Sequence, residues 1–112
     1  MDWTDPADVG RRLDALDAAL LEETAEGAAD RAVVDLDQQS VGRLSRMDAL
    51  QRQAMAASQE RRRIARRQRI QAARARLEAG EFGFCEECGD DIGANRLETD
   101  PTTPLCISCA RG

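Results

Sequence analysis

Residues 85–109 read CEECGDDIGANRLETDPTTPLCISC, and this stretch holds all four cysteines of the 112-residue chain. The cysteines form two C-x-x-C pairs with seventeen residues between them. Two such pairs at this separation are typical of a tetrahedral site in which each pair supplies two thiolates to one metal ion. Four sulfur ligands favour zinc, with iron as the softer alternative. We therefore predict one Zn²⁺ per chain, bound by Cys85, Cys88, Cys106 and Cys109.

Two other uses of these cysteines compete with a metal site. Two disulfides would suit a secreted domain, but the start MDWTDP has neither the basic nor the apolar segment of an export signal. A redox C-x-x-C would account for one pair and not for two. Four protein ligands leave no open position for water, so the predicted zinc is structural. Because the start shows no export signal, we predict a cytoplasmic protein. Because the chain has no histidine, no further cysteine and no carboxylate pair in a pocket-forming segment, we predict that it is not an enzyme.

The composition of the rest of the chain is typical of long helices. Charged residues make up 33% of the sequence, and the aromatic residues are Trp3, Phe82 and Phe84 alone. Such a chain has little material for a large globular core, so a structural metal would stabilise its smallest part. No apolar run approaches the length that spans a membrane, and we expect no membrane partner.

The first helix is predicted to start at Thr4-Asp5-Pro6, where a capping side chain precedes a proline that the first turn tolerates. Apolar residues then recur at spacings of four, three and four, which indicates one amphipathic stripe. Gly27 costs about 1 kcal/mol relative to alanine inside a helix. The helix is therefore either continuous or broken near residues 26–29, and we favour a helix to about residue 37. The stripe consists of Val9, Leu13, Leu16 and Leu20.

The second helix is predicted to follow a turn at residues 38–44. Ser45-Arg46-Met47-Asp48 fits a capping box, and Gly80 is a suitable C-terminal stop. A helix from there to about Ala79 has about thirty-five residues and a length of roughly 50 Å at 1.5 Å per residue. Its predicted inner face consists of Met47, Leu50, Ala54, Ala57, Ile64, Ile70, Ala73 and Leu77.

Charge is strongly segregated along the chain. Residues 1–42 hold eleven acids and three arginines, net −8, whereas residues 43–76 hold eleven arginines and two acids, net +9. Residues 77–112 hold eight acids and two arginines, net −6. Opposite charges favour two helices that attract each other, although the arginines also suit an acidic partner or a phosphate ligand.

The fold class that follows is all-α with a small zinc-finger module, because neither helix can bury its stripe alone. Residues 1–79 are predicted to form a long antiparallel two-helix coiled-coil hairpin with its tip at about residues 38–48. Residues 80–112 are predicted to form a zinc-finger module with four cysteine ligands. Phe82 and Phe84 are expected to pack this module on the helix ends, and no element is expected after Cys109.

The segment from Gly80 to Cys109 resembles the zinc finger of the DksA/TraR family of bacterial transcription regulators. The resemblance rests on F-G-x-C-x-x-C-G, the following I-G, R-L-E, Pro101 with Pro104, and L-C-I-x-C. The segment VGRLSRMDALQ at 41–51 is similar to the tip region of short members.

The resemblance implies a monomeric factor that binds RNA polymerase directly, without sequence-specific DNA binding. In the family the coiled coil enters the secondary channel, and its tip approaches the catalytic centre and alters promoter-complex stability. Several members act with the alarmone ppGpp in the stringent response. The tip residues that the resemblance assigns to polymerase contact are Arg43, Leu44, Ser45, Asp48 and Ala49.

The sequence departs from the family pattern at the tip and near the second cysteine pair. Long members carry D-x-x-D-x-A where this chain has Gly42, Ser45 and Met47, and Asp48 lies about one turn further on. Asp48 either replaces those acids or only stabilises the helix N-terminus. Long members also have a helix after the second C-x-x-C. Asp100 stands where a basic residue assists ppGpp binding in some members, which argues against ppGpp here.

Two other functions remain open. A zinc-dependent nucleic-acid-binding protein would place the arginines of the second helix on phosphates, and a structural adaptor would have no effect on transcription. Against nucleic-acid binding, the residues around the first cysteine pair are acidic, whereas a finger that reads a groove is basic. These acids are Glu86, Glu87, Asp90 and Asp91.

Overall fold

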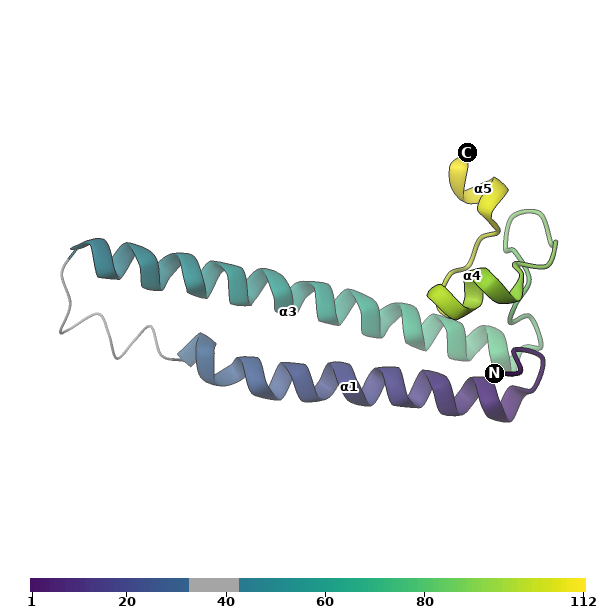
Figure 1. Cartoon of the computed structure of the whole chain (residues 1–112), viewed down its shortest axis with the longest axis horizontal. Helices are drawn as coiled ribbons and strands as arrows, with labels where there is room; N and C mark the ends of the chain where they lie inside the picture. The colour runs from purple at the N-terminus through teal and green to yellow at the C-terminus, as the bar shows by residue number, and fades with distance from the viewer. Residues whose placement is uncertain (33–42) are drawn as a thin grey trace. The chain divides into compact units, whose positions relative to one another are not determined.

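The structure, a computed structural model, describes the backbone of residues 1–32 and 43–112 and the side chains of residues 1–28 and 45–112. The described part contains the helices α1 (Pro6–Ala32), α3 (Arg43–Glu78), α4 (Ala94–Thr99) and α5 (Ile107–Arg111) (Figure 1). Within it the only β pairing is an isolated bridge between Phe84 and Asp91. The all-α prediction with a small C-terminal module is confirmed.

The chain forms two compact units. Unit 1 consists of Met1–Asp17 and Arg67–Gly112, and unit 2 consists of Ala18–Arg66. Both α1 and α3 contribute residues to each unit. The division at residues 79 and 80 that the sequence suggested stays a prediction.

The start of α1 agrees with its sequence signal. Asp5 Oδ1 accepts a hydrogen bond from the N–H of Ala7 at 3.0 Å, and the Asp5 carbonyl accepts one from Val9 at 3.1 Å. Pro6, the first helical residue, has no N–H that would need a partner. Helix α1 runs without interruption through Gly27 to Ala32, so the alternative of a break near residues 26–29 is wrong. The predicted continuation over residues 33–37 lies outside the described residues, as does most of the predicted turn at 38–44.

In unit 1 the two long helices pack antiparallel around a small apolar core. Val9 and Leu13 of α1 are fully buried, together with Ile70 and Ala73 of α3, which are 2% and 0% exposed. Charged pairs flank this core: Arg74 Nη2 donates to an Asp14 oxygen at 2.6 Å, and a second arginine, Arg67, pairs with Asp17 at 2.8 Å. Residue numbers on α3 fall as those on α1 rise, which is the mark of an antiparallel pair.

In unit 2 polar side chains join the two helices. Thr24 Oγ1 of α1 donates to Glu60 Oε2 of α3 at 3.0 Å. The same carboxylate accepts Arg63 Nε at 3.0 Å and Nη2 at 2.9 Å. Among the described side chains of unit 2, the buried apolar residues are Leu20 and Ala49 alone. The attraction between the two helices that charge segregation predicted is present in the Arg74–Asp14 and Arg67–Asp17 pairs of unit 1.

The predicted inner face of α3 is wrong at four of its first five positions. Met47, Leu50 and Ile64 are 53%, 50% and 47% exposed, and Ala54 is exposed too. The less exposed positions instead follow a heptad pattern through residues 49, 53, 56, 60, 63, 67 and 70. Several of these positions hold polar residues, so a pattern of apolar residues alone missed them. The prediction is right for Ile70 and Ala73, which are buried, and for Ala57 and Leu77, which are half-buried.

The N-terminus of α3 differs from the prediction, whereas its C-terminus agrees with it. The helix already includes Arg43 and Leu44, so Ser45 lies inside it and is not its N-cap. Arginine and leucine are good helix formers and do not stop the helix before Ser45. At the other end, Gly80 has a φ of 74° and donates to the Leu77 carbonyl at 3.2 Å, while Glu81 donates to that of Arg76 at 2.8 Å. These bonds form a Schellman motif, which needs a residue that tolerates positive φ.

Candidate metal centre

The first cysteine pair lies on a small loop built from backbone hydrogen bonds. The N–H of Cys85 donates to the Asp90 carbonyl at 2.8 Å, and Gly89 donates to the Cys85 carbonyl at 2.9 Å. Ile92 donates to the Gly83 carbonyl at 2.8 Å and closes the loop at its base. The loop therefore brings Cys85 and Cys88 to the same side without help from distant residues.

The second cysteine pair lies at the start of α5. Cys106 is the N-cap residue, and its carbonyl accepts the N–H of Ala110 at 2.9 Å. Cys109 follows within the first helical turn. The expectation that nothing forms after Cys109 is wrong, because α5 also includes Ala110 and Arg111. Cys106 and Cys109 are three residues apart and lie in one helical turn. Such a short helix forms here without a long apolar stripe.

The four sulfur atoms converge on one point. All four Sγ atoms lie within 4.8 Å of one another, and those of Cys88 and Cys106 are 3.6 Å apart. Sulfur atoms about 2.3 Å from a tetrahedral zinc are about 3.8 Å from each other. Disulfide sulfurs would be about 2.05 Å apart, so the disulfide alternative is excluded for this pair. The prediction of one structural Zn²⁺ bound by the four cysteines is confirmed.

The acid–base properties of these thiols also suit a divalent cation. The backbone N–H groups of Cys106 and Cys88 donate to Cys85 and lower its pKa to about 6. Hydrogen bonds that the Cys109 S–H makes to the sulfurs of Cys106, Cys85 and Cys88 stabilise its thiol form and raise the pKa of Cys109 above its ordinary value. Without a cation the crowded sulfurs cannot all be thiolates. A bound metal ion reverses this and favours the deprotonated form of every ligand.

An apolar cluster packs beside the cysteine loops. Cys85, Ile92 and Leu97 form its buried centre, and Trp3 and Phe82 pack against it. The Trp3 and Phe82 rings stack with centroids 6.4 Å apart and planes 24° apart. Trp3 Nε1 also donates to Glu98 at 3.0 Å. Phe82 thus packs as expected.

Phe84 and Trp3 differ from expectation. Phe84 is 52% exposed and takes no part in the core cluster, so the expected packing of this ring is wrong. The role of Trp3 was missed altogether. It contacts Glu98 across 95 residues of sequence, and no local pattern indicates such a distant contact.

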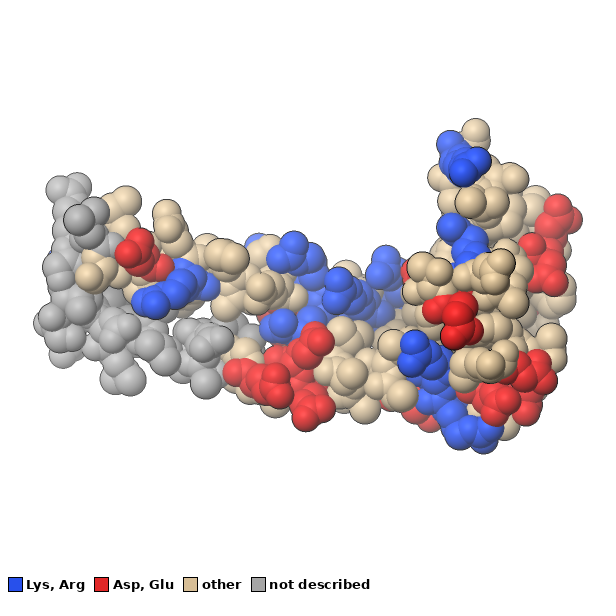
Figure 2. Space-filling model, in the orientation of Figure 1, with Lys and Arg blue, Asp and Glu red and all other residues tan. Residues whose placement is uncertain are grey.

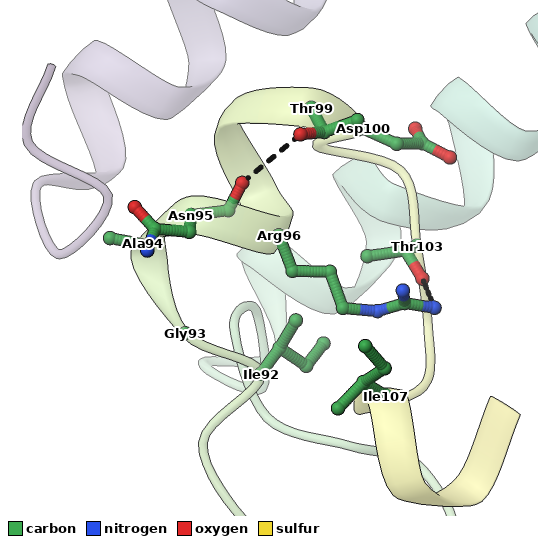
Figure 3. A pocket seen from close by; sticks show the side chains of 9 residues that line it. All are labelled: Ile92, Gly93, Ala94, Asn95, Arg96, Thr99, Asp100, Thr103 and Ile107. Carbon is green, nitrogen blue, oxygen red and sulfur yellow. Dashed lines mark hydrogen bonds between the residues drawn. The ribbon is translucent and has the colours of Figure 1, made fainter. Parts of the chain in front are cut away.

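Two arginines fasten the loop that carries the second cysteine pair. Arg76 of α3 is buried and donates through Nη2 to the Thr102 carbonyl at 3.1 Å. Arg96 of α4 donates through Nε to the Leu105 carbonyl at 2.8 Å and through Nη2 to Thr103 Oγ1 at 3.3 Å. In the close-up the Arg96 side chain reaches toward Thr103 (Figure 3). The Arg96 side chain also lines a hollow of about 660 Å³.

Comparison with known proteins now identifies the module. A family model, the prokaryotic dksA/traR C4-type zinc finger, matches residues 80–112. Residues 80–112 therefore match the zinc finger of the DksA/TraR family. In this DksA/TraR module the R-L-E residues divide the structural work: Arg96 holds the Leu105 carbonyl, Leu97 fills the core, and Glu98 accepts the indole N–H of Trp3.

Relatives agree with this assignment over part of their length. The chain is similar to the RNA polymerase-binding transcription factor DksA of Haemophilus influenzae, with 46% identity over 41 residues, 37% of this chain and 28% of the relative. The DksA of Escherichia coli K12 gives 46% identity over 37% of this chain and 27% of the relative. The chain thus matches under a third of the length of these curated relatives. Transcription factor DksA2 from Pseudomonas aeruginosa has a similar structure, with 25% identity, a TM-score of 0.59, and coverage of 90% of this chain and 81% of that chain.

The residues assigned to the DksA/TraR tip are only partly described. The side chains of Arg43 and Leu44 lie outside the described residues, whereas Ser45 and Asp48 are exposed. Ala49 is 3% exposed and faces the interior of unit 2. Because α3 includes Arg43, Asp48 lies beyond the first helical turn, where the helix dipole has little effect. A purely local role for the Asp48 carboxylate is therefore disfavoured.

None of the helices in the described part of the chain is long and apolar enough to cross a membrane.

Proposed function

We propose that this chain binds bacterial RNA polymerase directly and regulates transcription from the secondary channel. The observation that carries the proposal is the DksA/TraR zinc finger at residues 80–112, joined to antiparallel helices in a fold similar to that of transcription factor DksA2. The hairpin enters the channel, its tip approaches the catalytic centre, and promoter-complex stability changes. The protein acts in the cytoplasm as a monomer.

The surface near the start of α3 supports a role for Asp48 in this mechanism. Asp48 and Ser45 are exposed, and Asp48 has no acidic neighbour on α3 closer than Glu60. A solvent-exposed carboxylate at the end that enters the channel is free to act on the polymerase. Ala49 is buried, so its side chain is not available for contact with the polymerase.

Polymerase binding and in vitro transcription test the proposal. Purified chain is mixed with core polymerase, and transcription from a ribosomal promoter is measured with and without ppGpp. Wild type should bind and change the lifetime of the promoter complex, whereas Asp48→Asn should bind but lose most of that effect. Glu22→Gln, at an exposed acid of α1, is the matched control and should act like wild type. A wild-type chain that fails to bind polymerase would refute the proposal.

Nucleic-acid binding is the second candidate, and the arginines of α3 favour it. Figure 2 shows basic side chains gathered along the middle of this helix. Arg62, Arg66 and Arg69 are exposed and lie at i, i+4 and i+7, with no acid three or four residues away on α3. Like charges at these spacings weaken a helix, so an anionic partner would relieve the repulsion. A salt-dependent mobility shift with naked DNA at physiological ionic strength would support this candidate over polymerase binding.

A further inference from the structure

An aromatic hollow of about 370 Å³ lies beside the zinc-finger core, within unit 1. Its walls are mainly apolar and include the rings of Trp3, Phe82 and Phe84. Trp3 and Phe82 are half-buried and pack on the core, whereas Phe84 is 52% exposed and takes no part in the core cluster. Core packing therefore does not account for an aromatic residue at position 84.

Backbone contacts fix the segment that carries the exposed Phe84 ring. The N–H of Phe84 donates to the Glu81 carbonyl at 3.4 Å, and Phe84 is bridged to Asp91 across the base of the cysteine loop. Gly83, with a φ of 90°, makes the turn just before it. A backbone fixed in this way loses little conformational freedom when the ring that it carries meets a partner, which favours binding.

The charge around the hollow is acidic. Asp91 is the one charged residue among the described residues that line it, and its carboxylate is exposed. Glu81 and Glu98 are exposed on either side in sequence, and Glu98 already accepts the Trp3 N–H. An aromatic face beside carboxylates attracts a cation, both through the ring quadrupole and through charge-assisted hydrogen bonds. The same carboxylates repel phosphates, which disfavours a nucleic acid at this place.

We propose that this hollow receives an arginine or lysine side chain from RNA polymerase. The inference rests on the proposed function and names a second contact of the chain with polymerase, on the zinc-finger module. The long apolar stem of an arginine or lysine suits the apolar wall, and its charged end suits the ring of Phe84 and the carboxylate of Asp91. The contact anchors the module through one inserted cation.

Binding of the full zinc-containing chain to core polymerase, with substitutions at the hollow, tests this inference. Phe84→Leu keeps an apolar side chain but removes the aromatic ring, and Asp91→Asn removes the charge while Oδ1 still accepts the Gly93 N–H, now 2.9 Å away. Each substitution should raise the Kd for core polymerase by about threefold to thirtyfold. Asp91→Asn should also make the Kd less dependent on salt. Zinc content and helix content should stay at wild-type values.

Ile107→Leu is the matched control, because Ile107 lies on the same module and is also 52% exposed. It should bind like wild type. If wild type binds and both hollow variants bind equally well, the inference is wrong and the proposed function stands. If Ile107→Leu weakens binding as much as Phe84→Leu, the hollow is not a specific contact and the inference is also wrong. If wild type does not bind polymerase at all, the proposed function and the inference both fail.

Discussion

Replacing Arg76 with methionine should lower the free energy of unfolding of unit 1. Arg76 is 9% exposed, and its Nη2 donates at 3.1 Å to the carbonyl of Thr102, a residue that is itself 7% exposed. Methionine keeps the apolar stem but leaves this buried carbonyl without its donor. Hydrogen bonds from charged groups contribute about 1.5–3 kcal/mol, and we expect a loss of that size.

The ion pair between Arg76 and Glu86 should contribute much less. Its atoms are 3.5 Å apart, and the Glu86 side chain is 54% exposed. Pairs exposed to this extent contribute about 0–1 kcal/mol. Glu86→Gln is therefore the control that separates the buried hydrogen bond from the surface charge.

Urea unfolding of the zinc-containing chain measures both effects. Trp3, the sole tryptophan, lies in unit 1 and reports its unfolding by fluorescence. Arg76→Met should lower the midpoint at an unchanged slope, and Glu86→Gln should leave it almost unchanged. An Arg76→Met midpoint equal to that of wild type, or an equal loss in both variants, would show that the buried hydrogen bond does not fasten the module.

Four further outcomes are expected. Chelating the zinc should unfold residues 80–112 and abolish polymerase affinity while the helices survive in part, as measured by circular dichroism and pull-down. Zinc affinity should rise with pH above neutrality, because thiols of raised pKa must lose protons on binding. Cys85, with its pKa lowered to about 6, is already mostly thiolate at pH 7, so calorimetry in different buffers should count fewer than four released protons. Leu13→Ala should cost about 2–5 kcal/mol in urea unfolding, whereas Leu21→Ala, at a residue 46% exposed, should cost far less. Glu60→Leu should cost about 1–3 kcal/mol in the same assay, and adding Arg63→Leu should recover most of it, because the single change strands a charge that is only 12% exposed.

The parts that were predictable from sequence are those fixed by neighbours along the chain. Four cysteines at fixed spacing determine the zinc ligands, since the knuckle loops form from local hydrogen bonds. The signals at Asp5-Pro6 and at Gly80 likewise act within one helical turn, and both helix ends are where these signals place them.

The parts that were not predictable depend on which residues meet across the fold. The helix contact in unit 2 involves Glu60 and Arg63. A search for apolar periodicity misses these residues because they are polar, and it selects Ile64, which is exposed. The polarity of these two residues is compensated by contacts that form in the folded chain, among them the hydrogen bond from Thr24 on the other helix. The contact between Trp3 and Glu98 has the same character, because it exists only once the module has folded against the start of the chain.

The uneven burial of apolar side chains has a consequence for cooperativity. Unit 1 holds Val9, Leu13, Ile70 and the zinc-finger cluster, whereas the described side chains of unit 2 bury only Leu20 and Ala49 among apolar residues. Regions with few buried apolar contacts open at lower free energy than the rest of a protein. The described helical residues of unit 2, at 18–32 and 43–66, should therefore exchange their amide hydrogens and admit proteases while unit 1 stays closed. On heating, helix content should begin to fall before Trp3 fluorescence changes.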